Sequence, residues 1–375
     1  MKKDLFIIVN EDTFLISHRL RIAEMAKEKG WNVSIVAKDT GKRSFLEEEG
    51  FNFIHMPVNP TGMNLGEELK LLFFLRKLLK NNPGAVIHLV GLKNMLWGGI
   101  AAKITGHDKI VFAVSGLGTL FGEKSSKRIT GAILKILKTG IKGENKTVIF
   151  QNHEDEALFI SNGICKKEQS RYMIGSGVSV NLFKSKERKD HEPIRIIFTG
   201  RMLREKGILD LIEAAEILRP EYEEKVEFIL VGETRNNHYS LTKEELTELT
   251  DGRYIKWLGY RDDIPDLLAE SDIMCFPSYY REGVPKALLE ASAASLPIVT
   301  TDSIGCRDTV EDGVNGFLVK PHSPKEVARE LSVLIKDPDL RKRMGEASLE
   351  KAERMYEVED VAKKHLEIYE SFLKN

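Results

Sequence analysis

A regular alternation of short, β-branched apolar runs with longer segments of helical periodicity constrains the fold of this chain most. In the first half of the chain, we predict strands at 5–9, 33–37, 86–89, 110–114 and 147–150. In the second half, we predict strands at 195–199, 227–231, 254–258, 273–276 and 297–300. Strands that alternate with helices indicate an α/β fold with parallel sheets. The sequence therefore predicts two doubly wound, Rossmann-like domains.

A charged segment without apolar periodicity separates the two sets of strands, and it ends at Pro193. Such a segment is typical of an interdomain linker. We predict one domain at 1–183, a linker at 184–193, a second domain at 194–355, and a C-terminal helix at 356–375 that can pack back on the first domain. Ligands of open α/β sheets bind at the carboxyl ends of strands, so we expect the chemistry in a cleft between the two facing domains.

The composition is that of an ordinary globular protein. With 375 residues, of which 42% are apolar, the chain is long enough to bury two cores. The three cysteines are widely spaced, which disfavours disulfides and metal sites and fits a reducing cytoplasm. The run 5–9 is too short for the apolar region of a signal peptide. No stretch approaches the roughly 20 apolar residues of a membrane span, so we expect any membrane contact to be peripheral.

Charge is distributed unevenly along the chain. Residues 1–180 contain 26 Lys and Arg against 18 Asp and Glu, whereas the remainder contains 30 against 39. Seven basic residues and one acidic residue, Glu144, lie in the segment 124–146, between isoleucines and leucines at helical spacing. One hypothesis is a basic amphipathic helix that lies on an anionic membrane. The alternative is an ordinary surface helix that packs on its own domain.

Two common phosphate-binding motifs are missing where they are expected. The first predicted strand is followed by 10–13, which lacks the glycines of a dinucleotide-binding turn, and no P-loop motif occurs. The second half instead opens with a strand and a loop that contains Gly200, Arg201 and Lys206. Glycine lets the backbone approach a ligand closely, and the two cations can neutralise a diphosphate. This loop is therefore our candidate diphosphate site.

A second loop, after the predicted strand 273–276, leads from Glu282 into a predicted helix that contains Glu290. Proline at 285 suits the start of that helix, so the backbone N–H groups of Gly283 and Val284 are expected at its positive end. Glu290 and Glu282 can accept hydrogen bonds from ribose and hexose hydroxyls. Two glutamates at this spacing are common by chance, but their combination with the cationic loop is not.

Together these motifs resemble the retaining glycosyltransferases of family 4, which have the GT-B architecture of two facing Rossmann-like domains. The resemblance spans nearly the whole chain and includes the segment 305–316. It implies diphosphate contacts for Arg201 and Lys206, a ribose contact for Glu290 and a donor-hexose contact for Glu282. It also implies acceptor binding by the N-terminal domain, donor binding by the C-terminal domain, and catalysis without a metal or another cofactor.

Four further segments resemble a subgroup of that family that extends polyprenyl-diphosphate-linked sugars, including N-acetylgalactosaminyltransferases that act on undecaprenyl-diphosphate bacillosamine. They are 17–20, 115–118, 175–178 and 259–265. The resemblance implies a UDP-sugar donor, an N-acetylhexosamine as the transferred sugar, a polyprenyl-linked acceptor and an anionic membrane surface at the inner face of the cell membrane, with no nucleic acid partner. The chain departs from the family in lacking a glycine pair after its first strand.

Three residues of the N-terminal half are candidates for acceptor binding. His18 lies where we expect a helix to begin after the first strand, although a histidine there can equally cap the helix. Lys93 follows a predicted strand that ends near His88 and can meet an acceptor phosphate, whereas most loop lysines are only solvated. Ser115 begins one of the subgroup segments. Asp262 and neighbouring acids lack the arrangement of a metal site.

The sequence therefore favours a metal-independent retaining glycosyltransferase, with catalytic roles for Arg201, Lys206 and Glu282. An alternative enzyme is a nucleotide-sugar epimerase of the same fold, which needs neither an acceptor nor a basic membrane-facing helix. A noncatalytic sugar-nucleotide-binding protein is the alternative of another class. Loss of at least one of the cations or glutamates is expected in such a protein, and all four are present.

Overall fold

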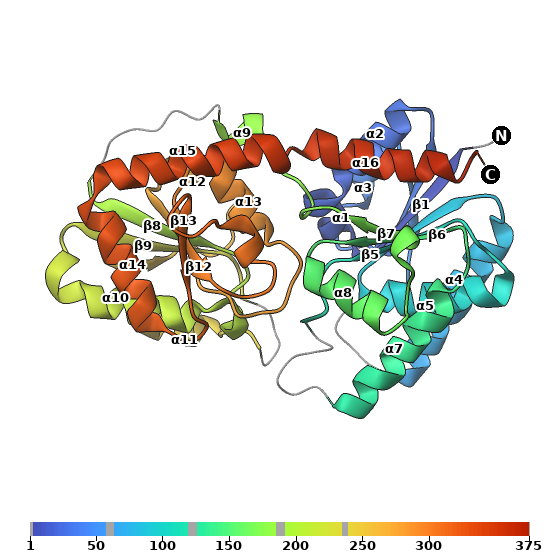
Figure 1. The fold of residues 1–375 in the computed structure, drawn as a ribbon, viewed down its shortest axis with the longest axis horizontal. Coiled ribbons are helices and arrows are strands. Elements are labelled where there is room, and N and C mark those ends of the chain that lie inside the picture. The colour runs from blue at the N-terminus through green and yellow to red at the C-terminus, as the bar shows by residue number, and fades with distance from the viewer. Residues whose placement is uncertain (1–2, 58–63, 119–125, 185–191, 235–238, 375) are drawn as a thin grey trace. The chain divides into compact units, whose positions relative to one another are not determined.

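The computed structural model describes residues 3–57, 64–118, 126–184, 192–234 and 239–374. The chain forms two compact units, one made of 1–176 and 358–375 and the other of 177–357 (Figure 1). The second unit begins at Gly177, whereas the first domain was expected to extend to 183, because helix α9 (Val180–Lys184) packs on helices of the second unit. Most of the predicted linker 184–193 lies outside the described residues.

The N-terminal unit is built on a seven-stranded parallel sheet with the order β3-β2-β1-β4-β5-β6-β7. Its strands are β1 (Asp4–Glu11), β2 (Asn32–Lys38), β3 (Asn52–His55), β4 (Val86–Val90), β5 (Ile110–Val114), β6 (Lys146–Phe150) and β7 (Ser170–Tyr172). Every residue of β4 and β5 is buried, as expected for central strands covered on both faces. The register pairs Ile7 with both Ile35 and His88.

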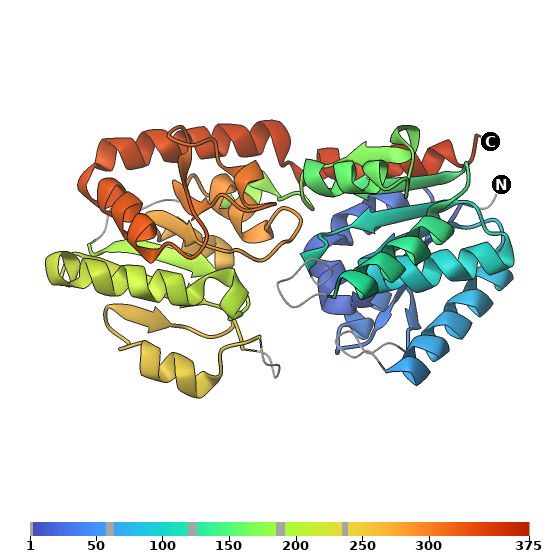
Figure 2. The ribbon, with the colours of Figure 1, turned by 60° about the horizontal axis from the view of Figure 1, so that its bottom comes forward.

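Helices cover both faces of this sheet (Figures 1 and 2). One core cluster joins the sheet to α1 (Asp12–His18), α2 (Leu20–Glu28), α3 (Arg43–Glu48) and the C-terminal helix α16 (Val358–Ser371). The other joins it to α4 (Leu65–Asn81), α5 (Leu92–Thr105), α7 (Lys127–Ile141) and α8 (His153–Ser161). Successive residues of β1 alternate between the two clusters, as the period of a strand requires.

The C-terminal unit contains a six-stranded parallel sheet with the order β10-β9-β8-β11-β12-β13. Its strands are β8 (Ile194–Thr199), β9 (Val226–Val231), β10 (Ile255–Trp257), β11 (Ile273–Phe276), β12 (Ile298–Thr301) and β13 (Gly316–Val319). Its longer helices are α10 (Ile208–Tyr222), α11 (Lys243–Leu249), α12 (Ile264–Ala269), α13 (Lys286–Ala293), α14 (Pro324–Lys336) and α15 (Pro338–Met355). Two parallel sheets with alternating helices confirm the predicted α/β fold.

Local sequence explains where several helices begin. Pro324 and Pro338 occupy the first positions of α14 and α15, where their missing N–H costs no helical hydrogen bond. The carboxylate of Asp337 accepts a hydrogen bond from the backbone N–H of Leu340 at 2.8 Å and so caps α15. Asn152 caps α8 in the same way, through the N–H of Asp155 at 2.7 Å.

The helix α16 docks on the N-terminal unit through a buried polar cluster. The Tyr369 hydroxyl lies 2.7 Å from Nδ1 of His88 in β4, and the ring of His365 is 5.5 Å from that of His88. The Arg19 guanidinium is buried close to them. Burial, together with the charge of Arg19, lowers the pKa of both histidines, so they are neutral in the folded protein.

Candidate functional site

The strand order of the C-terminal unit places its candidate site. β8 and β11 are neighbours at the centre of the sheet, and the order runs outward in opposite directions from them. Loops at the carboxyl ends of two such strands diverge, which makes this the usual ligand position in an open α/β sheet. The predicted residues Arg201 and Lys206 follow β8, and Glu282 follows β11. The topology therefore brings both predicted loops to one edge of the sheet.

Lys206 and Glu282 form an ion pair at the centre of this edge. The Lys206 ammonium lies 2.5 Å from Oε1 of Glu282, and the lysine is only 6% exposed. Its Nζ also lies 5.0 Å from the centre of the Phe276 ring and 5.8 Å from that of Tyr280. A cation held by a carboxylate and two aromatic faces has little freedom to move. The sequence analysis missed both aromatic residues, although Tyr280 lies two positions before Glu282.

Backbone contacts hold the loops of this site together. The carbonyl oxygen of Glu205 accepts hydrogen bonds from the N–H groups of Tyr279 and Tyr280, both at 3.0 Å, and so ties the β8 loop to the β11 loop. Gly207 has a φ of 76°, and a Cβ atom there would lie 2.0 Å from the carbonyl oxygen of Pro277. The same loops thus approach so closely that only glycine fits.

The β12 loop joins the same assembly through Gly305, where a Cβ atom would lie 1.8 Å from the carbonyl oxygen of Gly283. The Ser303 hydroxyl donates to the carbonyl oxygen of Ser278 at 2.8 Å. Three loops, after β8, β11 and β12, are therefore packed against each other. This packing explains why glycine at 305, part of the segment singled out in the sequence, matters for the site.

Arg201 supplies the exposed cation of the site. Its side chain is exposed and forms no ion pair with any residue that the structure describes. Burial raises the pKa of the nearby Tyr280 phenol, while the positive charge of Arg201 opposes that rise. The site thus presents one buried cation, Lys206, and one accessible cation, Arg201. This arrangement can bind a doubly charged anion.

Helix α13 carries the remaining predicted residues. Gly283 and Val284 are buried just before its first residue, Lys286. Glu290 lies one turn into the helix, and its Oε1 is 3.2 Å from the Lys286 ammonium. Burial raises the pKa of Glu290, and the charge of Lys286 offsets part of that rise. The helix therefore directs backbone N–H groups and one carboxylate toward the same end of the sheet.

The structure places the candidates of the N-terminal unit differently from the expectation. His18 ends α1 instead of beginning a helix, because the chain turns helical directly after β1, at Asp12. Its ring stacks on that of Phe14 with 4.3 Å between centres, and its Nδ1 lies 2.7 Å from the Ser17 hydroxyl. The histidine is therefore held by its own helix.

Lys93 and His88 also differ from their predicted positions. Lys93 lies in the first turn of α5, where its ammonium is 2.7 Å from Oε1 of Glu68, so it is not a loop lysine. His88 is central and buried in β4 instead of ending the strand. Ser115 follows β5, and its buried hydroxyl has no hydrogen-bond partner among the described residues. The three candidates lie on different elements: His18 at the end of α1, Lys93 in α5 and Ser115 after β5.

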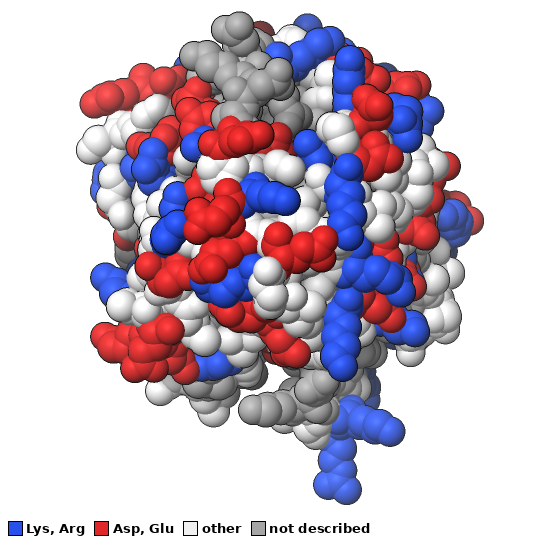
Figure 3. Space-filling view, turned by 90° about the vertical axis from the view of Figure 1, so that its left-hand side faces the viewer, with Lys and Arg blue, Asp and Glu red and all other residues white. Residues whose placement is uncertain are grey.

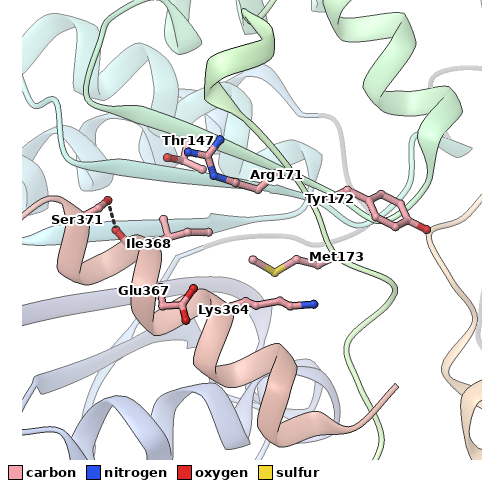
Figure 4. Close-up of a pocket in the computed structure, with 8 residues that line it drawn as sticks. All are labelled: Thr147, Arg171, Tyr172, Met173, Lys364, Glu367, Ile368 and Ser371. Atoms are coloured by element: carbon pink, nitrogen blue, oxygen red, sulfur yellow. Dashed lines mark hydrogen bonds between the residues drawn. The ribbon is translucent and has the colours of Figure 1, made fainter. Parts of the chain in front are cut away.

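A pocket of about 210 Å³ lies elsewhere in the N-terminal unit, between β6, β7 and α16 (Figure 4). Its lining residues are Thr147, Arg171, Tyr172, Met173, Lys364, Glu367, Ile368 and Ser371. The Ser371 hydroxyl donates to the carbonyl oxygen of Ile368 at 2.7 Å. None of the predicted site residues lines this pocket, so it is separate from the candidate site.

Comparison with known proteins agrees with this architecture. A family model described as glycosyl transferase 4-like matches residues 5–152, and one described as glycosyl transferases group 1 matches 179–351. Among solved structures, a glycosyltransferase from Rickettsia africae superposes with a TM-score of 0.79 over 100% of this chain and 99% of its own, at 20% identity. Anabaena HepE, solved with UDP and glucose, gives 0.80 over 98% of this chain and 100% of its own, at 21% identity.

Two curated relatives are also similar over most of their length. A Campylobacter jejuni N,N'-diacetylbacillosaminyl-diphospho-undecaprenol alpha-1,3-N-acetylgalactosaminyltransferase is 28% identical over 95% of this chain and 96% of its own. An Escherichia coli UDP-Gal:alpha-D-GlcNAc-diphosphoundecaprenol alpha-1,3-galactosyltransferase is 25% identical over 79% and 78%. The two family models and the two parallel sheets agree on the family of this chain. The chain belongs to the family 4 glycosyltransferases of GT-B fold.

Proposed function

We propose that this glycosyltransferase moves an N-acetylhexosamine from a UDP-sugar to a polyprenyl-diphosphate-linked saccharide, without a metal and with retention of the anomeric configuration. The names of the two curated relatives support the acceptor class, because both act on sugars linked to undecaprenol through a diphosphate. The observation that carries the proposal is the buried Lys206 ammonium, 2.5 Å from Glu282, beside the exposed Arg201.

In this proposal, Arg201 and Lys206 bind the diphosphate and neutralise the charge that grows on it as the bond to the sugar breaks. The N–H groups of Gly283 and Val284 add the positive end of α13. Glu290 accepts hydrogen bonds from the ribose, and Glu282 accepts one from the hexose while it positions Lys206. The acceptor hydroxyl then attacks the anomeric carbon on the face that the diphosphate leaves. The bond from that carbon to the diphosphate breaks, UDP departs, and the hydroxyl proton passes to the departing diphosphate oxygen.

Gly200 and the N-terminal unit complete the proposal. Gly200 follows β8 with a φ of 157°, and a Cβ atom on Gly232 would lie 1.8 Å from its carbonyl oxygen, so the loop backbone is tightly held next to Arg201. We assign acceptor binding to His18, Lys93 and Ser115, each of which follows a strand of the N-terminal sheet on its carboxyl side. For Lys93 this requires exchanging Glu68 for an acceptor phosphate.

The test is a panel of UDP-sugars offered with a short polyprenyl-diphosphate-sugar acceptor, with products identified by mass spectrometry. The proposal predicts an acceptor product that is one N-acetylhexosamine heavier, and nuclear magnetic resonance of that product reports the anomeric configuration. Incubation with donor alone separates the alternatives. An isomerised nucleotide sugar would identify an epimerase. Donor binding with no product even in the presence of the acceptor panel would identify a binding protein.

We also propose that the enzyme works at the inner face of the cell membrane, as a peripheral protein in the cytoplasm. Within the described part of the chain, no helix combines the length and the apolarity that a membrane crossing needs. The basic segment supports a surface contact through charge: Lys127, Arg128, Lys135 and Lys138 are exposed on α7. Its apolar side instead packs on its own unit, through Leu137 and Ile141, while Lys124 lies outside the described residues.

Charge is mixed on one face of the molecule. In the view of Figure 3, which faces the C-terminal unit, acidic and basic side chains are interspersed. Lys146, counted in the basic segment from the sequence, is buried in β6 and donates to the carbonyl oxygens of Gly140 at 2.7 Å and Lys142 at 3.1 Å. Within the basic segment, the charge available to a membrane is therefore that of the exposed residues on α7.

A further inference from the structure

An apolar stripe runs along the outer side of α4. Leu65 is 74% exposed, Leu69 is 42% exposed and Phe73 is 62% exposed. Residues four apart lie above each other on a helix, so the three side chains form one line about two turns long. The opposite side of α4 packs on the sheet through Leu71 and Leu75, which are buried. The side chains of the stripe therefore do not contribute to the core that holds α4 on the sheet.

Cations extend and flank this stripe. Four exposed basic residues belong to α4, and none forms an ion pair with another described residue: Lys70, Arg76, Lys77 and Lys80. Arg76 and Lys80 continue the line of Phe73 toward the end of the helix. Of the acidic residues of the first turn, Glu68 is less available, since its carboxylate binds Lys93 at 2.7 Å and also the indole N–H of Trp97. The outer side of α4 thus combines apolar and positive surface.

A neighbouring helix of the same layer repeats this combination on a smaller scale. α4, α5 and α7 lie side by side on one face of the sheet, so the outer sides of all three turn away from it (Figures 1 and 2). On α7, Ile129 is 56% exposed next to Lys127 and Arg128. Outer sides that turn away from the same face of the sheet suit an extended flat partner.

We propose that the outer side of α4 inserts Leu65, Leu69 and Phe73 into the interfacial region of an anionic lipid bilayer, with its cations on the lipid phosphates. Apolar side chains bordered by lysines match an interfacial helix, whereas interfaces between proteins are depleted in lysine. This inference deepens the proposed function, because a polyprenyl-linked acceptor lies in such a bilayer. The proposed function explains why the protein would bind a membrane, whereas the surface of α4 is the evidence that it does. It places the apolar contact on α4 and leaves α7 with a contact through charge.

The test compares binding of purified protein to vesicles made of equal parts phosphatidylglycerol and phosphatidylcholine. The Leu69→Ser/Phe73→Ser variant should lose binding by about tenfold or more, because two exposed apolar side chains no longer enter the interface. That loss should persist at high salt, which screens charge and leaves apolar contacts. The Arg76→Gln/Lys77→Gln/Lys80→Gln variant should lose binding at low salt and differ little from wild type at high salt.

The matched control is Phe45→Ser. Phe45 is 41% exposed in α3 of the same unit but is followed by acidic residues at 47–49, so its replacement should leave vesicle binding unchanged. Fluorescence of a Phe73→Trp variant gives a second measurement, which does not depend on lost affinity. Lipids brominated in their acyl chains should quench the added fluorescence relative to wild type. Circular dichroism and thermal melting check that each variant is folded.

Three results would overturn the inference. The first is unchanged vesicle binding by the Leu69→Ser/Phe73→Ser variant, and the second is no quenching of the Phe73→Trp variant. The third is a concentration-dependent dimer of the wild type that the Leu69→Ser/Phe73→Ser variant no longer forms, which would assign the stripe to self-association. Transfer to a water-soluble short-chain acceptor should be the same in wild type and in every α4 variant. If wild type transfers no sugar but still binds vesicles through Phe73, the proposed function fails and the membrane inference stands.

Discussion

Lys206 is held in position before any substrate arrives. A carboxylate, two aromatic rings and a glycine that fits closely under Pro277 all restrict its loop. Cations that are already in place stabilise a developing charge without the cost of reorganising solvent. At the scale of single residues, this fixed position is the strongest argument that Lys206 acts on the leaving diphosphate.

We predict that Arg201→Ala and Lys206→Ala each lower kcat by roughly 30-fold to 1000-fold, because one contact to a developing charge contributes about 2 to 4 kcal/mol. Steady-state kinetics with the identified donor measures the effect. Arg253→Ala is the matched control, since Arg253 is an exposed arginine of the same unit that pairs with Glu224. Near wild-type rates in both site variants would contradict the site.

The raised pKa of Glu290, a half-buried residue, predicts a pH dependence of donor binding. Burial raises the pKa of Glu290, so it becomes protonated at a higher pH than an exposed glutamate. A carboxylate accepts two ribose hydroxyls, whereas the protonated acid keeps less accepting capacity. Donor affinity should therefore fall as pH decreases through the raised pKa.

Donor KM measured between roughly pH 5 and 8 checks this, because unperturbed glutamate titrates below that range. In wild type, KM should rise toward the acidic end. In Glu290→Gln, KM should be high throughout and nearly independent of pH. A wild-type profile parallel to that of the glutamine variant would show that Glu290 does not bind the donor in its ionised form.

At the residue scale, the site residues could be predicted from two signals, charged side chains and glycines in loops that follow strands. Lys206 and Glu282 are 76 positions apart, and only the adjacency of β8 and β11 brings them within hydrogen-bond distance. Tyr280 was missed because an aromatic residue near a strand end usually signals core packing. Lys286, which pairs with Glu290, was missed because a lysine in a first helical turn is usually solvated.

At the scale of elements, long periodic segments were predictable and three of the shortest strands were not. The central strands β4 and β5 are buried on both faces and therefore read as continuous apolar runs. The missed strands β3, β7 and β13 have only three or four residues, and β7 is Ser-Arg-Tyr. Pairing with a neighbouring strand defines such segments, and pairing leaves little trace in a local pattern.

We predict that α16 is needed for the stability of the N-terminal unit. Tyr369→Phe leaves Nδ1 of buried His88 without its partner and should cost about 1 to 3 kcal/mol of unfolding free energy. Tyr369→Ala should cost more, about 3 to 5 kcal/mol, because it also leaves a cavity. Urea denaturation measures both. Equal stability of wild type and Tyr369→Ala would show that the helix is dispensable.

For α7 we predict binding through charge. Each basic residue near an anionic membrane contributes about 1 kcal/mol, so replacing Lys127, Arg128, Lys135 and Lys138 with glutamine should remove up to roughly 4 kcal/mol. Cosedimentation with phosphatidylglycerol vesicles at low salt measures this, and the difference should disappear at high salt. A variant with wild-type cosedimentation at low salt would make α7 an ordinary surface helix.

At the scale of the whole molecule, the two units were predictable from the restart of the strand pattern after Pro193. The border at Gly177 was not predictable, because it depends on the packing of α9 on helices of the second unit. The sequence predicts a C-terminal helix that can pack back on the first unit, and the return of 358–375 depends on contacts far apart in sequence. Hydrogen bonds from Arg21 to Glu359, at 2.5 and 3.0 Å, are one example. The borders of the second unit are therefore set by packing between residues that are far apart in the sequence.

In the proposed mechanism, cations of the protein neutralise the diphosphate. In other transferases, a divalent metal supplies this positive charge. In this proposal, Arg201, Lys206 and the positive end of α13 together neutralise the diphosphate. We therefore predict full transferase activity in excess EDTA, measured by product mass against the same assay with added magnesium or manganese. The physical reason is that the neutralising charges are covalently part of the chain and cannot be removed by a chelator.

The same reasoning predicts how a site variant responds to metal. Lys206→Ala lacks a charge fixed within its loop, and a free ion in solution has no comparable position, so added magnesium should restore little of the lost rate. A metal-dependent transferase assayed in parallel shows that the chelator is effective. If wild type loses its activity in EDTA and regains it with manganese, a metal carries the charge on the diphosphate, and Arg201 and Lys206 must be given the lesser role of holding the donor.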